Sequence, residues 1–234
     1  LIDLGGIAEL KGISIDGDTI TIGAMTTQHE LVTNEALAKA APLIREASLQ
    51  IADPQVRYMG TIGGNVANGD PANDMPGLMQ TLDATYHLTG PEGSRKVKAR
   101  DFYEAAYFTA REDEEILTAI SFAKPSGGFA YEKQKRKIGD YATAAAGVII
   151  TIEGGTCTAA SVALTNLSDT PVYCAAAVEA LVGSSLDDAT IKAAVTAAVD
   201  ASDPVADTRG PVDFKKHVAG VIVKKAITSA VARA

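Results

Sequence analysis

The sequence predicts an α+β protein whose sheet-rich first half is followed by three strands and then three helices. Three observations indicate this class. Apolar residues alternate in short runs through the first half, and the segment 124–128, Lys-Pro-Ser-Gly-Gly, interrupts the pattern as a linker. Beyond the linker, strand-like runs come first and helix-like runs follow. We therefore expect two domains, residues 1–124 and residues 125–234.

The strands of the first half begin with a β-hairpin predicted over residues 9–25. Isoleucines alternate on both of its arms, and Asp16-Gly17-Asp18 has the composition of a tight turn. Further strands are expected later in this half, at residues 84–89, 96–99 and 116–122.

Capping signals predict the helices of the first half. Thr27 followed by Glu30 has the pattern of a capping box, which opens a short helix. Pro42 suits the first turn of a second helix, and the dipeptide Asp53-Pro54 is expected to end it. One more short helix is expected over residues 76–82.

The second half has a simpler pattern. The run Ala144-Ala145-Ala146 favours a helix by propensity, but the β-branched run that follows it favours a strand, and we predict a strand. The turn Gly154-Gly155 separates the last two of the strands expected at residues 129–135, 142–152 and 156–165. The helices are expected at residues 173–182, 186–200 and 212–233.

The bulk composition excludes several kinds of partner. The net charge of −8 and the pI of about 4.9 argue against DNA, RNA or an anionic membrane as the main partner. No run approaches the roughly 18 apolar residues of a membrane span, and no signal peptide is visible. Cys157 and Cys174 have no Cys-x-x-Cys spacing, so we expect buried, reduced thiols. These properties favour a cytoplasmic protein.

A glycine-rich stretch carries the strongest functional signal, with the sequence Gly60-Thr61-Ile62-Gly63-Gly64-Asn65. Adjacent glycines let backbone N–H groups approach a ligand without an intervening Cβ atom, and clusters of such groups bind anions. Asp70 or Asp74, further along, can accept hydrogen bonds from sugar hydroxyls. The stretch therefore predicts a site for a phosphorylated cofactor. The alternative is a long solvated loop whose Asn and Asp side chains cap their own backbone.

The stretch matches neither of two common nucleotide motifs. No Gly-Lys-Ser/Thr follows at P-loop spacing, and the Gly-x-Gly-x-x-Gly of a Rossmann fold is missing. The three histidines are scattered, and no Ser-His-Asp or Cys-His arrangement can be argued. We therefore expect no catalytic and no metal-binding residues in this chain, as is typical when a cofactor carries the chemistry.

Residues 52–71 resemble a known family, and their sequence is ADPQVRYMGTIGGNVANGDP. This string is similar to the flavin-binding subunits of the molybdenum hydroxylases, and above all to the medium subunits of aerobic, molybdenum-containing carbon monoxide dehydrogenases. In that family the Thr-Ile-Gly-Gly-Asn segment binds the diphosphate region of FAD. A later aspartate contacts the ribose side of the cofactor and corresponds to Asp74. The resemblance thus implies that the segment in contact with the FAD diphosphate consists of Thr61, Ile62, Gly63, Gly64 and Asn65.

The resemblance continues through residues 131–142, YEKQKRKIGDYA, through residues 207–211, DTRGP, and along the final helix. It therefore spans essentially the whole chain. It implies that Tyr141 packs beside the isoalloxazine ring and that Lys137 lies near the flavin or its phosphates. The alternative for the basic run that contains Lys137 is a solvated strand face.

The chain departs from the family near its beginning. The family has an earlier subdomain with an Ala-Gly-Gly-His-Ser-type loop that forms the other wall of the diphosphate site, whereas Gly5-Gly6 is not followed by His-Ser. We therefore expect that this subdomain is absent here, either because it is a separate chain or because the sequence is truncated, and the start at Leu1 does not resemble a natural one. The implied fold is the second subdomain of a vanillyl-alcohol-oxidase/PCMH-type FAD domain, followed by a C-terminal three-stranded antiparallel sheet with three helices.

The resemblance also implies a function. It indicates an FAD-carrying electron-transfer subunit of a molybdenum hydroxylase, most similar to carbon monoxide dehydrogenase. The implied partners are a small iron–sulfur subunit and a large molybdopterin subunit in a dimer of heterotrimers, a heterohexamer, with an electron acceptor such as quinone. The expected location is the cytoplasm, or the inner face of the membrane through these partners. The alternatives are a flavin subunit of a xanthine, nicotine or aldehyde hydroxylase, and a cofactor-free assembly module.

Overall fold

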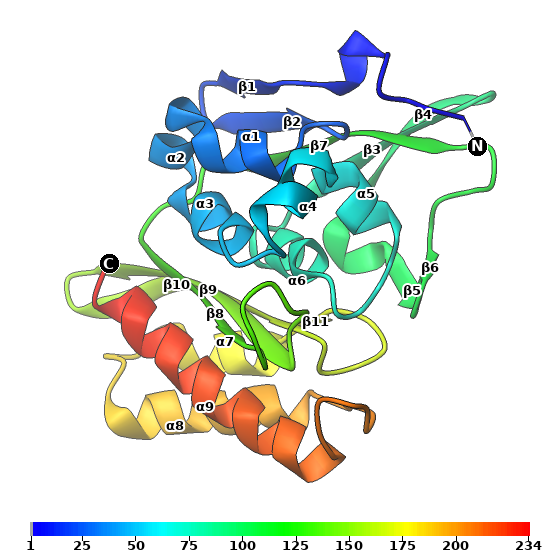
Figure 1. The fold of residues 1–234 in the computed structure, drawn as a ribbon. Helices are drawn as coiled ribbons and strands as arrows, with labels where there is room; N and C mark the ends of the chain where they lie inside the picture. The colour runs from blue at the N-terminus through cyan, green and yellow to red at the C-terminus, as the bar shows by residue number, and fades with distance from the viewer. Residues whose placement is uncertain (1) are drawn as a thin grey trace.

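The computed structural model describes residues 2–234, and in it sheets and helices alternate in four layers (Figure 1). A sheet of the first half lies at one end, and the helices of that half separate it from the sheet of the second half. The last helices of the chain cover the far face of the second sheet. The chain has α+β architecture, as predicted.

The first sheet has five antiparallel strands in the order β1-β2-β7-β3-β4. The predicted hairpin is confirmed, with Ile13 opposite Ile22 in its register. Ile20 and Ile22 are fully buried, because alternate residues of β2 face the helices of the first half. The strands are β1 (Ile13–Asp16), β2 (Thr19–Gly23), β3 (Thr85–Gly90), β4 (Gly93–Lys98) and β7 (Ile116–Ala123).

Side-chain caps determine where the helices of this half begin. The capping box predicted at Thr27 and Glu30 is confirmed. Three helices were not predicted, and each begins at a capping side chain: Asn34 caps α2, Asp53 caps α4 with Pro54 in its first turn, and Thr61 caps α5. The helices are α1 (Gln28–Thr33), α2 (Glu35–Ala40), α3 (Pro42–Ser48), α4 (Pro54–Met59), α5 (Ile62–Ala67) and α6 (Asp74–Thr81).

The second sheet has four antiparallel strands in the order β11-β10-β9-β8. Three of them were predicted, and a two-residue strand, β11, adds a fourth at the edge beside β10. Its pairing depends on the path of the chain after β10 rather than on any local pattern. The strands are β8 (Gly128–Gln134), β9 (Ala144–Glu153), β10 (Thr156–Thr165) and β11 (Val172–Tyr173).

The alanine run of β9 is a strand because both faces of this strand are buried. Ala145 belongs to the core between the sheets, and Ala144 and Ala146 belong to the core under the last helices. The helix α6 packs so closely on this sheet that a Cβ atom at Gly147 would overlap Thr81, and one at Gly77 would overlap Thr165. Small residues fit this narrow space, so packing overrides the helical propensity of alanine.

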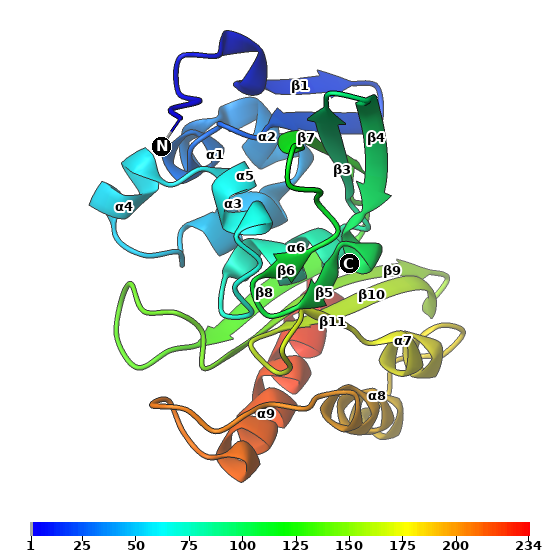
Figure 2. The same cartoon turned by 90° about the vertical axis from the view of Figure 1, so that its right-hand side faces the viewer.

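The last three helices complete the second half, and they are α7 (Ala175–Leu181), α8 (Asp188–Asp200) and α9 (Val212–Val231). The loop between β8 and β9 and the segment before α9 project on the same side of the molecule (Figure 2). The chain also contains a small hairpin of β5 (Tyr103–Ala105) and β6 (Phe108–Thr109). The short 3-10 helices are η1 (Ala8–Leu10) and η2 (Ala99–Asp101).

Within residues 2–234, no helix combines the length and apolar character that crossing a membrane requires. Both cysteines are buried free thiols, as expected, and burial raises the pKa of Cys174 to about 12.

Candidate functional site

The glycine-rich stretch forms the first turn of α5 rather than the loop that its composition suggested. Thr61 caps this helix, and its Oγ1 accepts a hydrogen bond from Gly64 N at 3.1 Å. Ile62 and Val66, four residues apart, bury the same helix face in the core. A threonine cap and two buried residues at helical spacing therefore override the low helix propensity of the glycines.

Some backbone amides of this turn point into the protein rather than toward solvent. Ile62 N donates to Thr26 O at 2.9 Å, and Gly63 N donates to Ala24 O at 2.8 Å. Among residues 2–234, the N–H of Thr61 has no hydrogen-bond acceptor. The expectation that adjacent amides of the whole stretch face a ligand is therefore wrong in part, and Thr61 retains a free donor.

The two adjacent glycines have different surroundings. A Cβ atom on Gly63 would lie 2.5 Å from Ala24 Cβ, so packing alone requires glycine there. Gly64 is exposed, and a Cβ atom would meet only Thr61 Oγ1, at 3.0 Å. Nothing in the core requires glycine at position 64, which leaves backbone open to close approach from outside.

Asn65 joins α5 to α6 through its amide and its carbonyl. Its Oδ1 accepts a hydrogen bond from Met75 N at 3.1 Å, and its carbonyl oxygen accepts one from Asn73 Nδ2 at 2.9 Å. Asn65 therefore orders the turn that leads into Asp74, at the start of α6.

The carboxylate of Asp74 is buried and internally bonded, which differs from the sugar-facing role expected of it. The residue is 3% exposed, and its two oxygens lie 2.6 Å from Tyr131 Oη and 2.7 Å from Lys133 Nζ. Burial raises the pKa of this carboxyl above its usual value, while the charge of Lys133 opposes the rise. In this structure Asp74 fixes β8 to α6.

The lysines of the basic run differ in their exposure to solvent. Lys133 points inward to Asp74, and its side chain is 1% exposed. Lys135, two residues on, is half-buried, and burial followed by the charge of Lys133 lowers the pKa of its ammonium group. Lys137 is exposed in the loop between β8 and β9, where its carbonyl oxygen accepts a hydrogen bond from Asp140 N at 3.2 Å.

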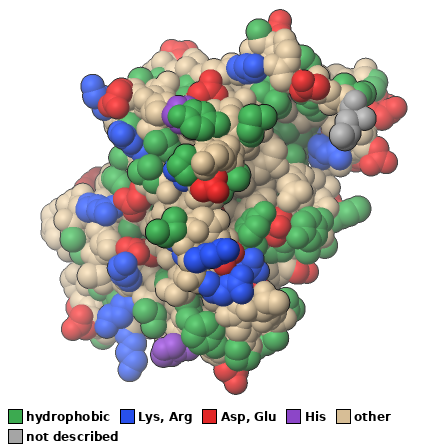
Figure 3. All heavy atoms as spheres, viewed as in Figure 1, with side chains coloured by type: hydrophobic (Ala, Val, Ile, Leu, Met, Phe, Trp, Pro, Cys, Tyr) green, Lys and Arg blue, Asp and Glu red, His purple; other side chains and the backbone are tan. Residues whose placement is uncertain are grey.

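Tyr141 lies at the surface of the same loop, and the residue is 49% exposed. The guanidinium carbon of Arg209 lies 5.7 Å from the centre of this ring, within cation–π range. Lys and Arg side chains gather around acidic groups over this loop, beside exposed hydrophobic side chains (Figure 3). The region therefore combines a half-exposed aromatic ring with positive charge, which suits an anionic cofactor with a planar ring.

Tyr107 completes this region and was not predicted. It is an exposed residue with a positive φ of 62° in the β5–β6 turn, and its N–H donates to Gly69 O at 2.8 Å, just beyond α5. A hydrogen bond with Asp70 raises the pKa of its phenol. The β5–β6 turn is thus fixed to the backbone just beyond α5. No sequence signal distinguished Tyr107 from an ordinary turn residue.

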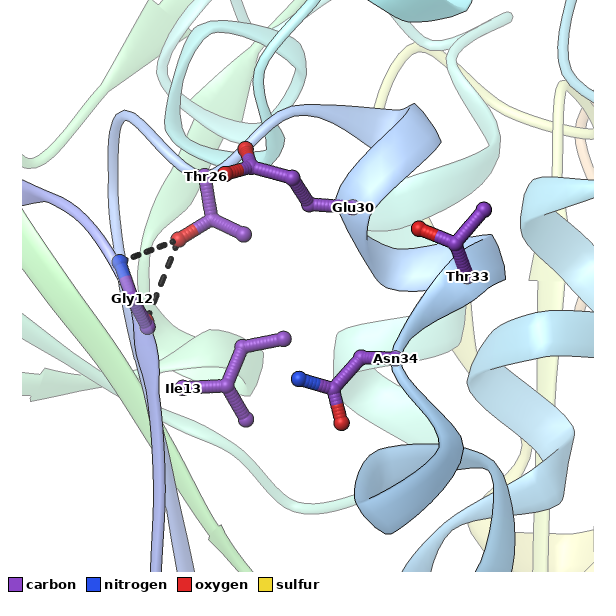
Figure 4. A pocket seen from close by; sticks show the side chains of 6 residues that line it. All are labelled: Gly12, Ile13, Thr26, Glu30, Thr33 and Asn34. Carbon is purple, nitrogen blue, oxygen red and sulfur yellow. Dashed lines mark hydrogen bonds between the residues drawn. The ribbon is translucent and has the colours of Figure 1, made fainter.

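A separate small pocket does not contain the predicted residues. It has a volume of about 170 Å³ and lies between the β1–β2 hairpin and α1 (Figure 4). Thr26 Oγ1 bonds to both Gly12 N and Gly12 O at 3.1 Å, and Glu30 is engaged in the capping box with Thr27. The Thr26 hydroxyl and the Glu30 carboxylate therefore already have partners within the fold.

Comparison with known families defines the class of protein. Residues 1–125 match the family model described as the FAD binding domain in molybdopterin dehydrogenase. Residues 129–230 match the model described as the CO dehydrogenase flavoprotein C-terminal domain. The chain is thus a flavoprotein of the molybdopterin dehydrogenase class. Within that class it belongs to the family of FAD-binding carbon monoxide dehydrogenase medium chains.

Individual relatives support this assignment. The carbon monoxide dehydrogenase medium chain of Afipia carboxidovorans is 55% identical over 100% of this chain and 82% of its own length. The corresponding chain of Hydrogenophaga pseudoflava is 41% identical over the same shares. The solved reconstituted CO dehydrogenase from Oligotropha carboxidovorans superposes with a TM-score of 0.95 over 97% of this chain and 80% of that one. Relatives named for nicotine and for xanthine are each 28% identical.

Proposed function

We propose that this chain is the flavin subunit of a carbon monoxide dehydrogenase, holding FAD and transferring electrons from iron–sulfur clusters to an external acceptor. The identities of 55% and 41% to two carbon monoxide dehydrogenase medium chains support this reaction over that of relatives named for nicotine or xanthine, at 28%. The substrate itself would be oxidised on another subunit.

The observation that carries the cofactor assignment is the open backbone of Gly64 beside the free amide of Thr61. These two features lie at the start of α5, where the amides of Ile62, Gly63 and Gly64 are bonded within the protein and the Thr61 N–H is the donor left for a negatively charged group. Gly63 has a packing reason to be glycine and Gly64 has none, so approach of a ligand explains the second glycine. The residues present therefore fit the diphosphate of FAD.

The remaining predicted residues divide into direct and indirect roles. Ile62 is fully buried, and Asn65 bonds to α6, so these two residues shape the turn. Asp74 holds Lys133 and the end of β8. Tyr141 and Lys137 are exposed on the loop between β8 and β9, and we assign Tyr141 to the flavin ring and Lys137 to its anionic part. We infer that the cofactor extends from α5 past the β5–β6 turn to Tyr141.

When bound, FAD supplies the electron-accepting chemistry that no side chain of this protein provides. The protein binds and orients the cofactor: Thr61 donates its amide, Gly64 allows close approach, and the ring of Tyr141 excludes water from one side.

The partners and the location are part of the same proposal. We propose a small iron–sulfur subunit and a large molybdopterin subunit, assembled as a dimer of heterotrimers, with a quinone as acceptor. We also propose a cytoplasmic location, or one at the inner membrane face through these partners. The net charge of −8 and the two buried free thiols support a reducing, aqueous environment.

A substrate test separates this proposal from its alternatives. In the complete enzyme, carbon monoxide should bleach the flavin absorbance under anaerobic conditions, whereas xanthine, nicotine and an aldehyde should not. Bleaching by one of these organic substrates alone would assign the chain to that hydroxylase. A complete complex without flavin bands would support a cofactor-free assembly module and refute the FAD assignment.

A further inference from the structure

Two segments far apart in the sequence meet beside Tyr141. One is the loop between β8 and β9, and the other is the segment that leads into α9 (Figure 2). Charged side chains from both segments and from α9 form one group, which we call the ion-pair cluster: Arg136, Asp140, Asp207, Arg209 and Lys215.

Two carboxylates join the cations of the ion-pair cluster. Asp140 lies 3.0 Å from Arg136 Nε and 3.9 Å from Arg209 Nη2. Asp207 lies 3.3 Å from Arg209 Nη1 and 3.0 Å from Lys215 Nζ. Each carboxylate therefore bridges two cations, and Arg209 is the cation that both carboxylates share.

The cluster is anchored on a long helix. Lys215 lies in the first turns of α9, and its side chain is 1% exposed, so its ammonium group holds Asp207 against a rigid element. Burial, the largest single effect, tends to raise the pKa of Asp207, but the hydrogen bonds from Lys215 and Arg209 and the charge of Lys215 together outweigh it and lower that pKa. Asp207 Oδ1 also accepts a hydrogen bond from Arg209 N at 2.8 Å. Asp207 therefore binds both the backbone and the side chain of Arg209.

The same cluster reaches Tyr141 in two ways. Asp140 Oδ1 accepts a hydrogen bond from Tyr141 N at 2.9 Å, and the guanidinium of Arg209 lies 5.7 Å from the Tyr141 ring centre. Arg209 Nε is buried and has no acceptor among residues 2–234. An unpaired buried donor is unfavourable, so the two carboxylates and the ring, rather than full hydrogen bonding, account for the position of this guanidinium.

We infer that Arg209 is a positioning residue for Tyr141: it ties the tyrosine ring to α9 through Asp207 and Lys215 and thereby sets how the ring meets the flavin. The inference rests on the proposed function for its flavin part. The alternative is that the ion-pair cluster only joins two loops and has no effect at the cofactor.

The first experiment measures the loop without FAD. Amide hydrogen exchange over residues 136–141 should be roughly three- to tenfold faster in Arg209→Gln, because one ring contact and two partly exposed ion pairs are lost. Arg209→Lys keeps the charge, so its exchange rate should lie between those of the unmodified protein and Arg209→Gln. The matched control is Arg45→Gln on α3, which removes an exposed arginine 3.7 Å from Glu35 and should leave this exchange unchanged.

The second experiment reads the flavin itself in the complete enzyme. Arg209→Gln should shift the midpoint potential and the fluorescence of bound FAD, and Arg209→Lys should restore part of the shift. In a Tyr141→Ala background, Arg209→Gln should cause no additional shift, because its effect is transmitted through the ring.

Two results would overturn the inference. One is a flavin signal that Arg209→Gln leaves unchanged, and the other is an equal shift with or without the Tyr141 ring. Absence of flavin bands from the unmodified enzyme contradicts the proposed function instead. In that case the exchange experiment, which needs no FAD, still decides whether Arg209 holds the loop.

Discussion

Lys133 Nζ on β8 lies 2.7 Å from the Asp74 carboxylate on α6, and this ion pair joins the two halves of the chain. Tyr131, on the same face of β8, donates its hydroxyl to the other carboxylate oxygen at 2.6 Å. All three groups are shielded from solvent. A buried charge that loses its partner is strongly unfavourable, so the two groups must stay together. The pair therefore holds the second sheet at a defined place beside the candidate cofactor site.

Removing one member of this pair should be strongly destabilising. Lys133→Met leaves the Asp74 carboxylate buried without its cation, and we expect the free energy of unfolding to fall by about 3–5 kcal/mol. Asp74→Asn should cost a similar amount, because it leaves the ammonium group unpaired. The measurement is urea unfolding followed by circular dichroism.

The double variant Asp74→Asn/Lys133→Met supplies the control for that prediction. It removes both charges, so its loss should be clearly smaller than the sum of the two single losses. Additivity within about 0.5 kcal/mol would show that the two groups do not interact in solution.

The two adjacent glycines should respond differently to the same change. Gly63→Ala forces a methyl group against Ala24, so we expect a loss of about 1–3 kcal/mol in unfolding free energy. Gly64→Ala adds a methyl group on the exposed side of α5, where it meets only the capping hydroxyl of Thr61 at 3.0 Å, so stability should change by less than about 1 kcal/mol. FAD retention should nevertheless fall in Gly64→Ala. A stable Gly64→Ala enzyme with full flavin content would contradict the proposed diphosphate site.

The ring of Tyr141 should influence reaction of the flavin more than its retention. The residue is half exposed at the surface, so Tyr141→Ala should leave FAD bound and the fold intact. The reoxidation rate of reduced enzyme should change, because one face of the flavin gains access to water. Tyr141→Phe keeps the ring and should behave like the unmodified protein. Stopped-flow absorbance measures these rates, and equal rates in all three proteins would leave Tyr141 as a packing residue.

Acid should release the loop that carries Tyr141. A hydrogen bond from Arg136 lowers the pKa of Asp140, and Lys215 and Arg209 together lower that of Asp207 against the opposing effect of burial. A carboxyl with a lowered folded-state pKa stabilises the fold fully above its unfolded value of about 3.9, and the contribution is lost as the pH falls through the folded value. Hydrogen exchange over residues 136–141, corrected for intrinsic rates, should therefore stay constant from about pH 5 to 8 and rise below about pH 4.

Asp140→Asn provides the comparison for the acid experiment. This variant should exchange faster at neutral pH and show a weaker response to acid, because Asp207 is then the only carboxylate of the ion-pair cluster left to titrate. The charged groups around these carboxylates are Arg136, Arg209 and Lys215, and none of them titrates in this range. An identical acid response in both proteins would exclude Asp140 as a source of the effect.

Local patterns in the sequence were sufficient for most of the fold. The capping box at Thr27, the hairpin turn at Gly17 and the strands around Gly154 each depend on neighbours a few residues away, and all three were predicted. The glycine-rich stretch as a cofactor site stays a prediction, and its backbone was expected to be a loop. Thr61 in fact caps a helix, because burial of Ile62 and Val66 outweighs glycine propensity.

Tertiary structure alone decided which polar groups remain available to a ligand. In sequence, Gly63 and Gly64 are equivalent, as are Lys133 and Lys137, yet one member of each pair is used inside the protein and the other is open. Their partners, Ala24 and Asp74, lie far away along the chain, and no local pattern encodes such contacts. The sequence therefore determined the family and most of the elements, while long-range packing determined which atoms of the candidate site remain available to a ligand.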